Sequence, residues 1–123
     1  MASSVANIVV VDDHVPYAEA IGLAISLTPD LELAGRAHDI TSALELCDRA
    51  KPDLLISDYG LPAGKTGTAL ASQLRDAKFT NPIIILTGFL APQVRREAGE
   101  LDNVDAISKD ESCLLYTSDA ADE

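Results

Sequence analysis

Five side chains in this sequence are of types that, brought together, could bind a divalent cation and accept a phosphoryl group. They are the carboxylates of Asp12, Asp13 and Asp58, the hydroxyl of Thr87 and the ammonium group of Lys109. A carboxylate can attack an activated phosphorus compound to give an acyl phosphate, while lysine offers a mobile positive charge and threonine a hydrogen bond. Separately these residues are ordinary, because acids often cap helices and lysines usually face solvent. The chemistry therefore depends on whether the fold brings all five to one place.

Apolar segments of the sequence predict five strands that could carry these residues. Residues 7–11, 53–57 and 82–86 are continuous apolar runs rich in β-branched side chains, and weaker runs occupy 31–37 and 104–108. Continuous runs of this kind are typical of strands that are covered on both faces, as in a parallel sheet.

Segments with helical spacing of apolar residues separate the predicted strands. Two are centred near Ile21 and Leu44, and two more occupy 68–78 and 91–101. Prolines close to their ends supply stop signals. Alternating strands and helices with short connections predict an α/β fold, a doubly wound five-stranded parallel sheet with helices on both faces.

The five polar residues fall at the ends of the predicted strands. Asp12 and Asp13 follow the first strand, Asp58 the third, Thr87 the fourth and Lys109 the fifth. In an open α/β sheet the binding crevice lies beyond the carboxyl ends of the strands. We therefore expect these residues to converge although they are far apart in the sequence.

Three converging carboxylates would need a positive counter-charge. At separations of about 5 Å and an effective dielectric of about 20, each pair would repel by about 3 kcal/mol. A divalent cation is the natural compensation. A few oxygen ligands that leave room for water and a phosphate oxygen favour Mg2+ over zinc or an all-protein calcium site.

With these residues placed, the sequence resembles the response regulator receiver domains of two-component signalling. The resemblance covers essentially residues 7 to 111, and it rests on four motifs: Val10-Val11-Asp12-Asp13-His14, Ser57-Asp58-Tyr59-Gly60-Leu61-Pro62, Leu86-Thr87-Gly88 and Ser108-Lys109-Asp110. It implies the flavodoxin-like receiver fold over residues 1–112. It also implies that Asp58 is the phosphoacceptor, that Thr87 and Lys109 assist catalysis, and that Asp12, Asp13, Asp58 and the backbone carbonyl of Gly60 bind Mg2+.

The resemblance further implies a signalling switch rather than a metabolic enzyme. Its phosphodonor would be a sensor histidine kinase or a phosphotransfer protein, it would catalyse only its own phosphoryl transfer and dephosphorylation, and a homodimer could form on phosphorylation. The Asp-Asp-His opening and the segment at residues 28–35 are most similar to receivers attached to helix-turn-helix output domains of the LuxR/NarL type.

Position 106 departs from the family pattern. An aromatic side chain three residues before the lysine usually swings inward on phosphorylation, but this chain has Ala106. We therefore hypothesise a weakened or altered output. An alternative interpretation is a pseudo-receiver, an interaction module that is never phosphorylated, although the intact acids and Lys109 argue against it.

A second alternative is nucleotide binding through residues 60–66, Gly-Leu-Pro-Ala-Gly-Lys-Thr, which resemble a phosphate-binding P-loop. The loop has three residues between its glycines instead of four, and Pro62 lacks an N–H that a phosphate cradle would use. We therefore rank nucleotide binding below the receiver hypothesis.

Composition limits the other classes of function. Nine basic residues against twenty acidic ones give a net charge of −11, which disfavours direct contact with nucleic acid or an anionic membrane. The apolar runs are too short to span a membrane, and the expected location is cytoplasmic. Cys47 and Cys113 have no neighbouring ligands at zinc-site spacing, and Cys47 is predicted to be a small core residue of a helix.

Residues 113–123, Cys-Leu-Leu-Tyr-Thr-Ser-Asp-Ala-Ala-Asp-Glu, resemble a translated sequencing-library adapter. The fifth helix of the family should begin near Glu111, so we expect its sequence here to be non-native. A truncated reading frame of this kind would also remove a downstream output domain.

Overall fold

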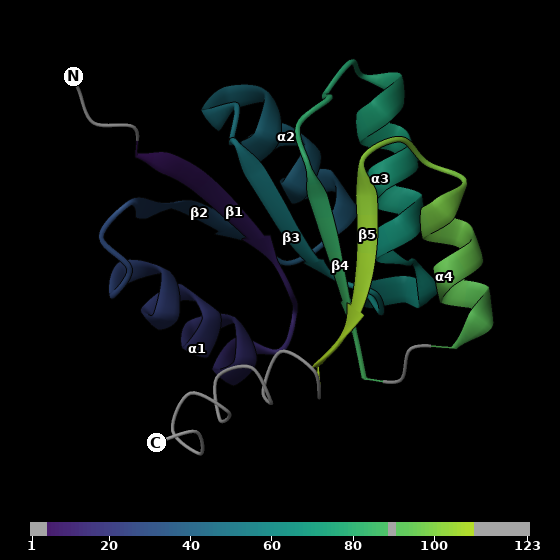
Figure 1. Ribbon diagram of the computed structural model, residues 1–123, viewed down its shortest axis with the longest axis horizontal. Coiled ribbons are helices and arrows are strands. Elements are labelled where there is room, and N and C mark those ends of the chain that lie inside the picture. The colour runs from purple at the N-terminus through teal and green to yellow at the C-terminus, as the bar shows by residue number, and fades with distance from the viewer. Residues whose placement is uncertain (1–4, 89–90, 110–123) are drawn as a thin grey trace.

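Strands and helices alternate along the chain in the computed structural model, which describes residues 5–88 and 91–109 (Figure 1). The predicted fifth helix and the tail at 113–123 lie outside the described residues. The elements in chain order are β1 (Ala6–Val11), α1 (Val15–Ser26), β2 (Leu31–Ala37), α2 (Ile40–Ala50), β3 (Leu54–Asp58), a 3-10 turn (Pro62–Gly64), α3 (Gly67–Asp76), β4 (Ile83–Thr87), α4 (Pro92–Gly99) and β5 (Val104–Ser108).

The five strands form one parallel sheet in the order β2-β1-β3-β4-β5. This order is that of the flavodoxin-like fold, so the predicted fold class is confirmed. One detail differs from the sequence prediction. Asp58 and Thr87 occupy the last positions of β3 and β4 instead of following them, because both residues still pair with the neighbouring strand.

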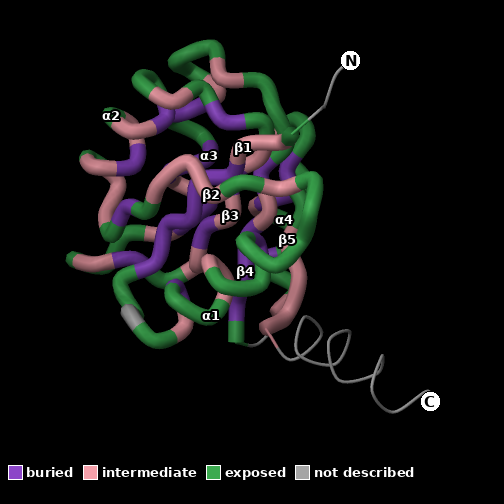
Figure 2. The backbone as a smooth tube through the Cα atoms, turned by 90° about the vertical axis from the view of Figure 1, so that its left-hand side faces the viewer, coloured by how far each residue is buried: buried purple, intermediate pink, exposed green. Residues whose placement is uncertain are grey.

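The packing of β1 on both faces of the sheet explains why its sequence is a continuous apolar run. Val9 and Val11 belong to the larger core cluster, whereas Ile8 and Val10 belong to a smaller cluster on the opposite face of the sheet. Successive side chains of a strand point to opposite faces, so a strand covered on both sides needs apolar residues throughout. Figure 2 shows these central strands as the buried centre of the molecule.

The helices lie in two layers around the sheet. The smaller cluster is formed with α1 and includes Ala18 and Ile25. The larger cluster is formed with α2, α3 and α4, and it includes Cys47, Leu70 and Ala98. Cys47 is buried on α2, as the sequence predicted.

Side chains cap the helices that flank the larger core. Asp39 and Ser42 form a reciprocal capping box at the start of α2, in which Asp39 Oδ1 accepts a hydrogen bond of 2.8 Å from the Ser42 N–H. Thr66 Oγ1 accepts a bond of 3.1 Å from the Ala69 N–H and caps α3. These caps satisfy backbone donors that the first turn of a helix leaves unpaired.

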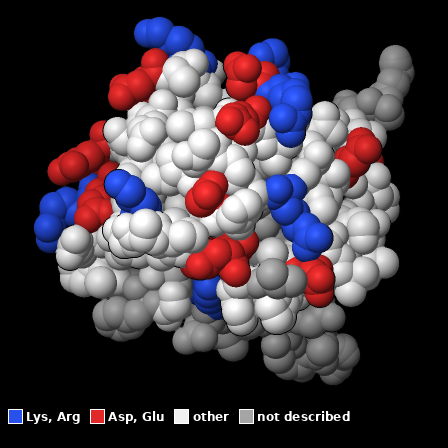
Figure 3. Space-filling view, turned by 180° about the vertical axis from the view of Figure 1, so that it is seen from behind, with Lys and Arg blue, Asp and Glu red and all other residues white. Residues whose placement is uncertain are grey.

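Charged side chains are interspersed on the surface. On the face drawn in Figure 3, lysine and arginine lie among aspartate and glutamate without forming one broad basic patch. Within the described part of the chain, none of the helices is both long enough and apolar enough to cross a membrane.

Candidate functional site

The carboxyl ends of the parallel strands bring the predicted acidic residues together. Asp12 and Asp13 directly follow β1, and Asp58 ends β3, the strand that pairs with β1. One carboxylate oxygen from each of the three residues lies within 4.8 Å of the other two. The structure therefore brings the three acids together, as the sequence predicted.

Asp12 is the buried member of this cluster, with 5% of its surface exposed. Its Oδ1 accepts a hydrogen bond of 2.8 Å from the His14 N–H, whereas its Oδ2 is buried without a hydrogen-bond partner in the described part of the chain. Burial raises the pKa of Asp12, and the negative charges of Asp58 and Asp13 add to that effect against the His14 bond and the Lys109 charge. A buried carboxylate oxygen that lacks a donor suits a metal ligand.

Lys109 lies directly after β5 and points back to Asp58. Its Nζ lies 3.0 Å from Asp58 Oδ1, with both side chains mostly shielded from solvent. Burial on its own would lower the pKa of Lys109, but the hydrogen bond and charge of Asp58, with the charge of Asp12, raise it overall. Lys109 is therefore a permanent positive charge at this carboxylate.

Tyr17 is a site residue that the sequence analysis missed. The Lys109 Nζ lies 4.4 Å from the centre of its ring, within cation–π distance. Tyr17 belongs to the first turn of α1, and its position two residues after a helix start gave no signal of its own. The ring and Asp58 together fix the direction of the lysine side chain.

The donor set fits Mg2+. Three carboxylates, one of them with an unpaired buried oxygen, provide hard oxygen ligands in small number. Gly60 is exposed two residues beyond Asp58, and its backbone pairs with Thr66 in an isolated antiparallel bridge. The remaining positions would be left to water and to phosphate oxygens.

The loop after Asp58 does not have the open backbone of a P-loop. The Leu61 N–H donates to the Lys65 carbonyl, the Lys65 N–H to the Pro62 carbonyl and the Gly67 N–H to the Tyr59 carbonyl. These N–H groups are used within the loop and cannot also cradle a phosphate. The geometry therefore gives no support to nucleotide binding through residues 60–66.

Thr87 and Ala106 lie on the β4 and β5 side of the site. Thr87 is buried and pairs with Ser108 across the two strands. Ala106 packs against the larger core, and its small side chain borders a hollow of about 170 Å³ between α4 and β5. The hollow is also lined by Arg95, Ala98, Gly99, Val104 and Asp105.

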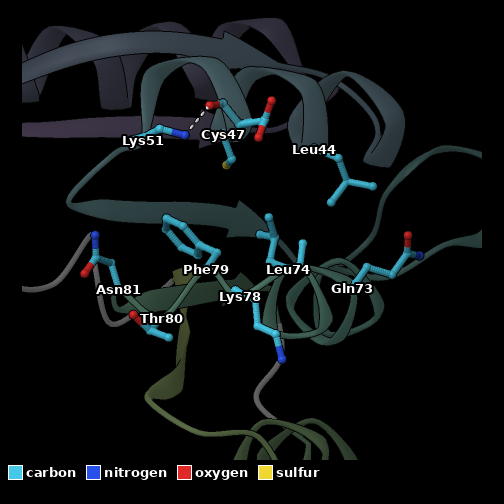
Figure 4. A pocket seen from close by; sticks show the side chains of 11 residues that line it. Leu44, Cys47, Lys51, Gln73, Leu74, Lys78, Phe79, Thr80 and Asn81 are labelled. Atoms are coloured by element: carbon cyan, nitrogen blue, oxygen red, sulfur yellow. Dashed lines mark hydrogen bonds between the residues drawn. The ribbon is translucent and has the colours of Figure 1, made fainter.

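A larger hollow of about 390 Å³ lies at the opposite end of the sheet, between the carboxyl-terminal ends of α2 and α3 (Figure 4). Cys47 lines it from the α2 side and Leu74 and Phe79 line it from the facing side, and Lys51 turns its Nζ toward the Asp48 carbonyl at 2.9 Å. It contains none of the predicted site residues. The chemistry is therefore concentrated at the carboxyl ends of the strands.

Comparisons with known proteins identify the family of this chain. The family model for the response regulator receiver domain matches residues 8–114. The transcriptional regulatory protein YdfI of Bacillus subtilis is 31% identical over 117 residues, which are 94% of this chain and 54% of YdfI. The probable transcriptional regulatory protein NarL of Mycobacterium tuberculosis is 29% identical over 92 residues, 75% of this chain and 42% of NarL. The chain thus spans about half the length of these relatives.

Solved structures give the same result. The signal receiver domain of NarL from Mycobacterium tuberculosis superposes with a TM-score of 0.80 and 27% identity, covering 87% of this chain and 86% of that one. A LuxR-family two-component response regulator from Aurantimonas sp. SI85-9A1 has a TM-score of 0.82 and 26% identity, covering 96% and 85%. The predicted similarity to receivers of LuxR/NarL-type regulators is confirmed, and this chain belongs to the response regulator receiver domain family.

Proposed function

We propose that this chain is a phosphoacceptor receiver in which Asp58 takes a phosphoryl group in a Mg2+-dependent reaction. The observation that carries the proposal is the convergence of Asp12, Asp13 and Asp58 within 4.8 Å, with Lys109 3.0 Å from Asp58. A purely structural ion pair would need one carboxylate, whereas three carboxylates around one lysine suit a site that also takes a cation.

Each residue then has a role in the transfer. A carboxylate oxygen of Asp58 attacks phosphorus, the bond between phosphorus and the donor's leaving group breaks, and the leaving group carries away its electron pair. Lys109 would follow the added negative charge, and the Thr87 hydroxyl would donate to a phosphoryl oxygen. Bound Mg2+ would neutralise charge on the transferring group. Asp12, Asp13, one oxygen of Asp58 and the Gly60 carbonyl would hold that cation, while the other oxygen of Asp58 is the nucleophile.

The proposed donor is a sensor histidine kinase or a phosphotransfer protein, and the product is a change of conformation that controls an output. The similarity to YdfI and NarL, both transcriptional regulators by name, supports an output in transcription. The net charge of −11 disfavours contact of this segment with DNA, so we propose that another domain would make any such contact. We propose a cytoplasmic signalling role and dimerisation on phosphorylation as parts of the same switch.

Intact-mass measurement after incubation with a small acyl-phosphate donor tests the central claim. The chain should gain one phosphoryl group with Mg2+ and none after chelation, and Asp58→Asn should gain none. Circular dichroism on the same samples must show that both proteins are folded. A folded chain that acquires no adduct would instead support the pseudo-receiver interpretation, in which Asp58 and Lys109 form only a structural ion pair.

A further inference from the structure

Glu97 of α4 joins both ends of the loop that follows Asp58. Its Oε1 accepts a hydrogen bond of 3.1 Å from the Tyr59 hydroxyl and one of 2.7 Å from the Thr68 hydroxyl, and its Oε2 accepts one of 2.9 Å from the Gln93 amide. Tyr59 is the residue next to Asp58, and Thr68 lies in the first turn of α3. One carboxylate thus connects α4 to the phosphoacceptor loop and to α3.

The backbone of Tyr59 is held on two sides. Its N–H donates to the Leu86 carbonyl of β4 at 2.7 Å, and its carbonyl accepts from the Gly67 N–H at 2.7 Å. Gly67 packs so closely that an added Cβ would lie 2.5 Å from the Asp58 carbonyl oxygen. Tyr59 therefore links the neighbour of Asp58 to β4 and α3 through its backbone and to Glu97 through its hydroxyl.

Charge strengthens this connection. Hydrogen bonds from Thr68 and Gln93, and then from Tyr59, lower the pKa of Glu97 in spite of its partial burial. Burial, and then the bond and charge of Glu97, raise the pKa of Tyr59. Both shifts keep the proton on the tyrosine and the negative charge on the glutamate, so the bond is charge-assisted at neutral pH.

The other side of α4 is less filled. Ala98 packs in the larger core, but Arg95 and Gly99 face the hollow beside Ala106. An aromatic side chain at position 106 would have filled space there. α4 is therefore joined to α3 and to the phosphoacceptor loop through Glu97, while its packing against β5 includes a hollow.

Resting on the proposed phosphorylation of Asp58, we propose that Glu97 is a positioning residue that transmits changes at the phosphoacceptor loop to α4 through Tyr59 and Thr68. This connection would serve in place of the aromatic switch that Ala106 removes. It makes α4 the responding element, with its contact to β5 as the part that changes.

Amide chemical shifts of the full chain test this proposal, with beryllium trifluoride and Mg2+ as the phosphoryl analogue. In the unsubstituted chain the amides of Val94 and Ala98 should shift on binding. Tyr59→Phe and Glu97→Gln should each reduce those shifts roughly twofold or more, and the double variant should lose no more than either single one, because one connection is being removed. Full shifts in both single variants, or strictly additive losses, would overturn the proposal.

Two matched substitutions of Thr68 distinguish the effect of its hydrogen bond to Glu97 from the effect of its packing. Thr68→Ser keeps the hydroxyl and should keep the α4 response, whereas Thr68→Val keeps the shape and should weaken it. Glu100→Gln, an exposed glutamate after the last turn of α4, is the control and should leave the response intact. Equal effects of the two Thr68 substitutions would refute the role of the hydroxyl.

The phosphoryl adduct is measured on the same variants by intact mass. Tyr59→Phe and Glu97→Gln should still form it on Asp58, so that loss of the α4 response is separated from loss of chemistry. Normal adducts with an unchanged α4 response would reject the coupling and leave the receiver function standing. A folded, unsubstituted chain that forms no adduct would reject both proposals.

Discussion

Asp12 carries an electrostatic cost in the metal-free protein. Its Oδ2 is buried without a hydrogen-bond donor in the described part of the chain, and two further carboxylates lie within the same 4.8 Å cluster. Such a residue is retained for binding or chemistry at the expense of stability. The same carboxylate that destabilises the free site would be the best-shielded ligand of a bound cation.

Replacing Asp12 by asparagine should therefore stabilise the metal-free protein and abolish its response to Mg2+. We expect a gain of about 1 kcal/mol in the free energy of unfolding without metal, since repulsion from Asp13 and Asp58 is removed. Urea unfolding with Mg2+ or with a chelator measures both effects. Asp13→Asn is the control, because Asp13 is exposed and should lower the Mg2+ response with little change in metal-free stability. A less stable metal-free Asp12→Asn protein would contradict the argument.

Gly67 is a second residue whose type is dictated by its surroundings. A Cβ at this position would lie 2.5 Å from the Asp58 carbonyl oxygen and 3.1 Å from the Ser57 hydroxyl. Gly67→Ala should therefore lower the free energy of unfolding by about 1 to 3 kcal/mol and displace the phosphoacceptor. Gly99→Ala, where no atom lies within 4 Å of the added Cβ, should cost nothing measurable. Chemical denaturation of the two variants compares them, and equal stabilities would show that the loop yields without cost.

At the scale of elements, the capping box of α2 makes the stability of this helix depend on pH. The side-chain and backbone hydrogen bonds of Ser42 lower the pKa of Asp39 below its usual value of 3.8. Because the pKa of Asp39 is lower in the folded state than in the unfolded state, its carboxylate stabilises the folded protein at pH values above the unfolded-state pKa. This contribution is lost as the pH falls through the folded-state pKa.

Asp39→Asn keeps an oxygen acceptor and removes only the charge. The stability difference between the unsubstituted chain and this variant should be constant from neutral pH down to about 4 and should shrink below that. Urea midpoints measured at several pH values give the comparison. A difference that does not change with pH would assign the cap to hydrogen-bond geometry alone.

The elements and their order could be predicted because strong local signals mark them. The run at β1 alternates between two cores, and Pro82 separates α3 from β4. The acid cluster followed from the rule that carboxyl ends of parallel strands converge. The predictions placed Asp58 and Thr87 one residue beyond their strands, since hydrogen bonding to a neighbouring strand is not visible in one segment's sequence.

Contacts between distant elements could not be predicted in this way. Tyr59 and Glu97 are 38 residues apart, one in the loop after β3 and the other on α4, and neither carries a sequence signal for the other. Tyr17 gave no signal for its contact with Lys109. Such pairs depend on how far one helix is rotated and shifted against another, which periodicity leaves undetermined.

At the scale of the whole molecule, a cation that binds only the folded state lowers the population of the globally unfolded state. Every residue that becomes exposed only by global unfolding is then protected to the same extent. The expected gain is RT ln(1 + [L]/Kd), about 1.4 kcal/mol at a concentration ten times the dissociation constant. The acid cluster lies at the carboxyl ends of the strands, while Cys47 lies at the other end of the sheet near the end of α2. Cys47 can therefore report on metal binding without contact with the metal.

Alkylation of Cys47 should be slow in the folded protein and slower still with Mg2+. Only 4% of this residue is exposed, and burial raises the pKa of its thiol to about 11, so little thiolate is available at pH 8. In a Cys113→Ser background, where Cys47 is the remaining cysteine, Mg2+ at ten times its dissociation constant should slow alkylation about tenfold, because the modified state is the globally unfolded one.

Sodium chloride of equal ionic strength controls for screening of the acidic surface, and Asp12→Asn should show no Mg2+ effect. If Mg2+ binds but the rate is unchanged, the α2 end opens locally, and the two ends of the sheet do not unfold as one unit.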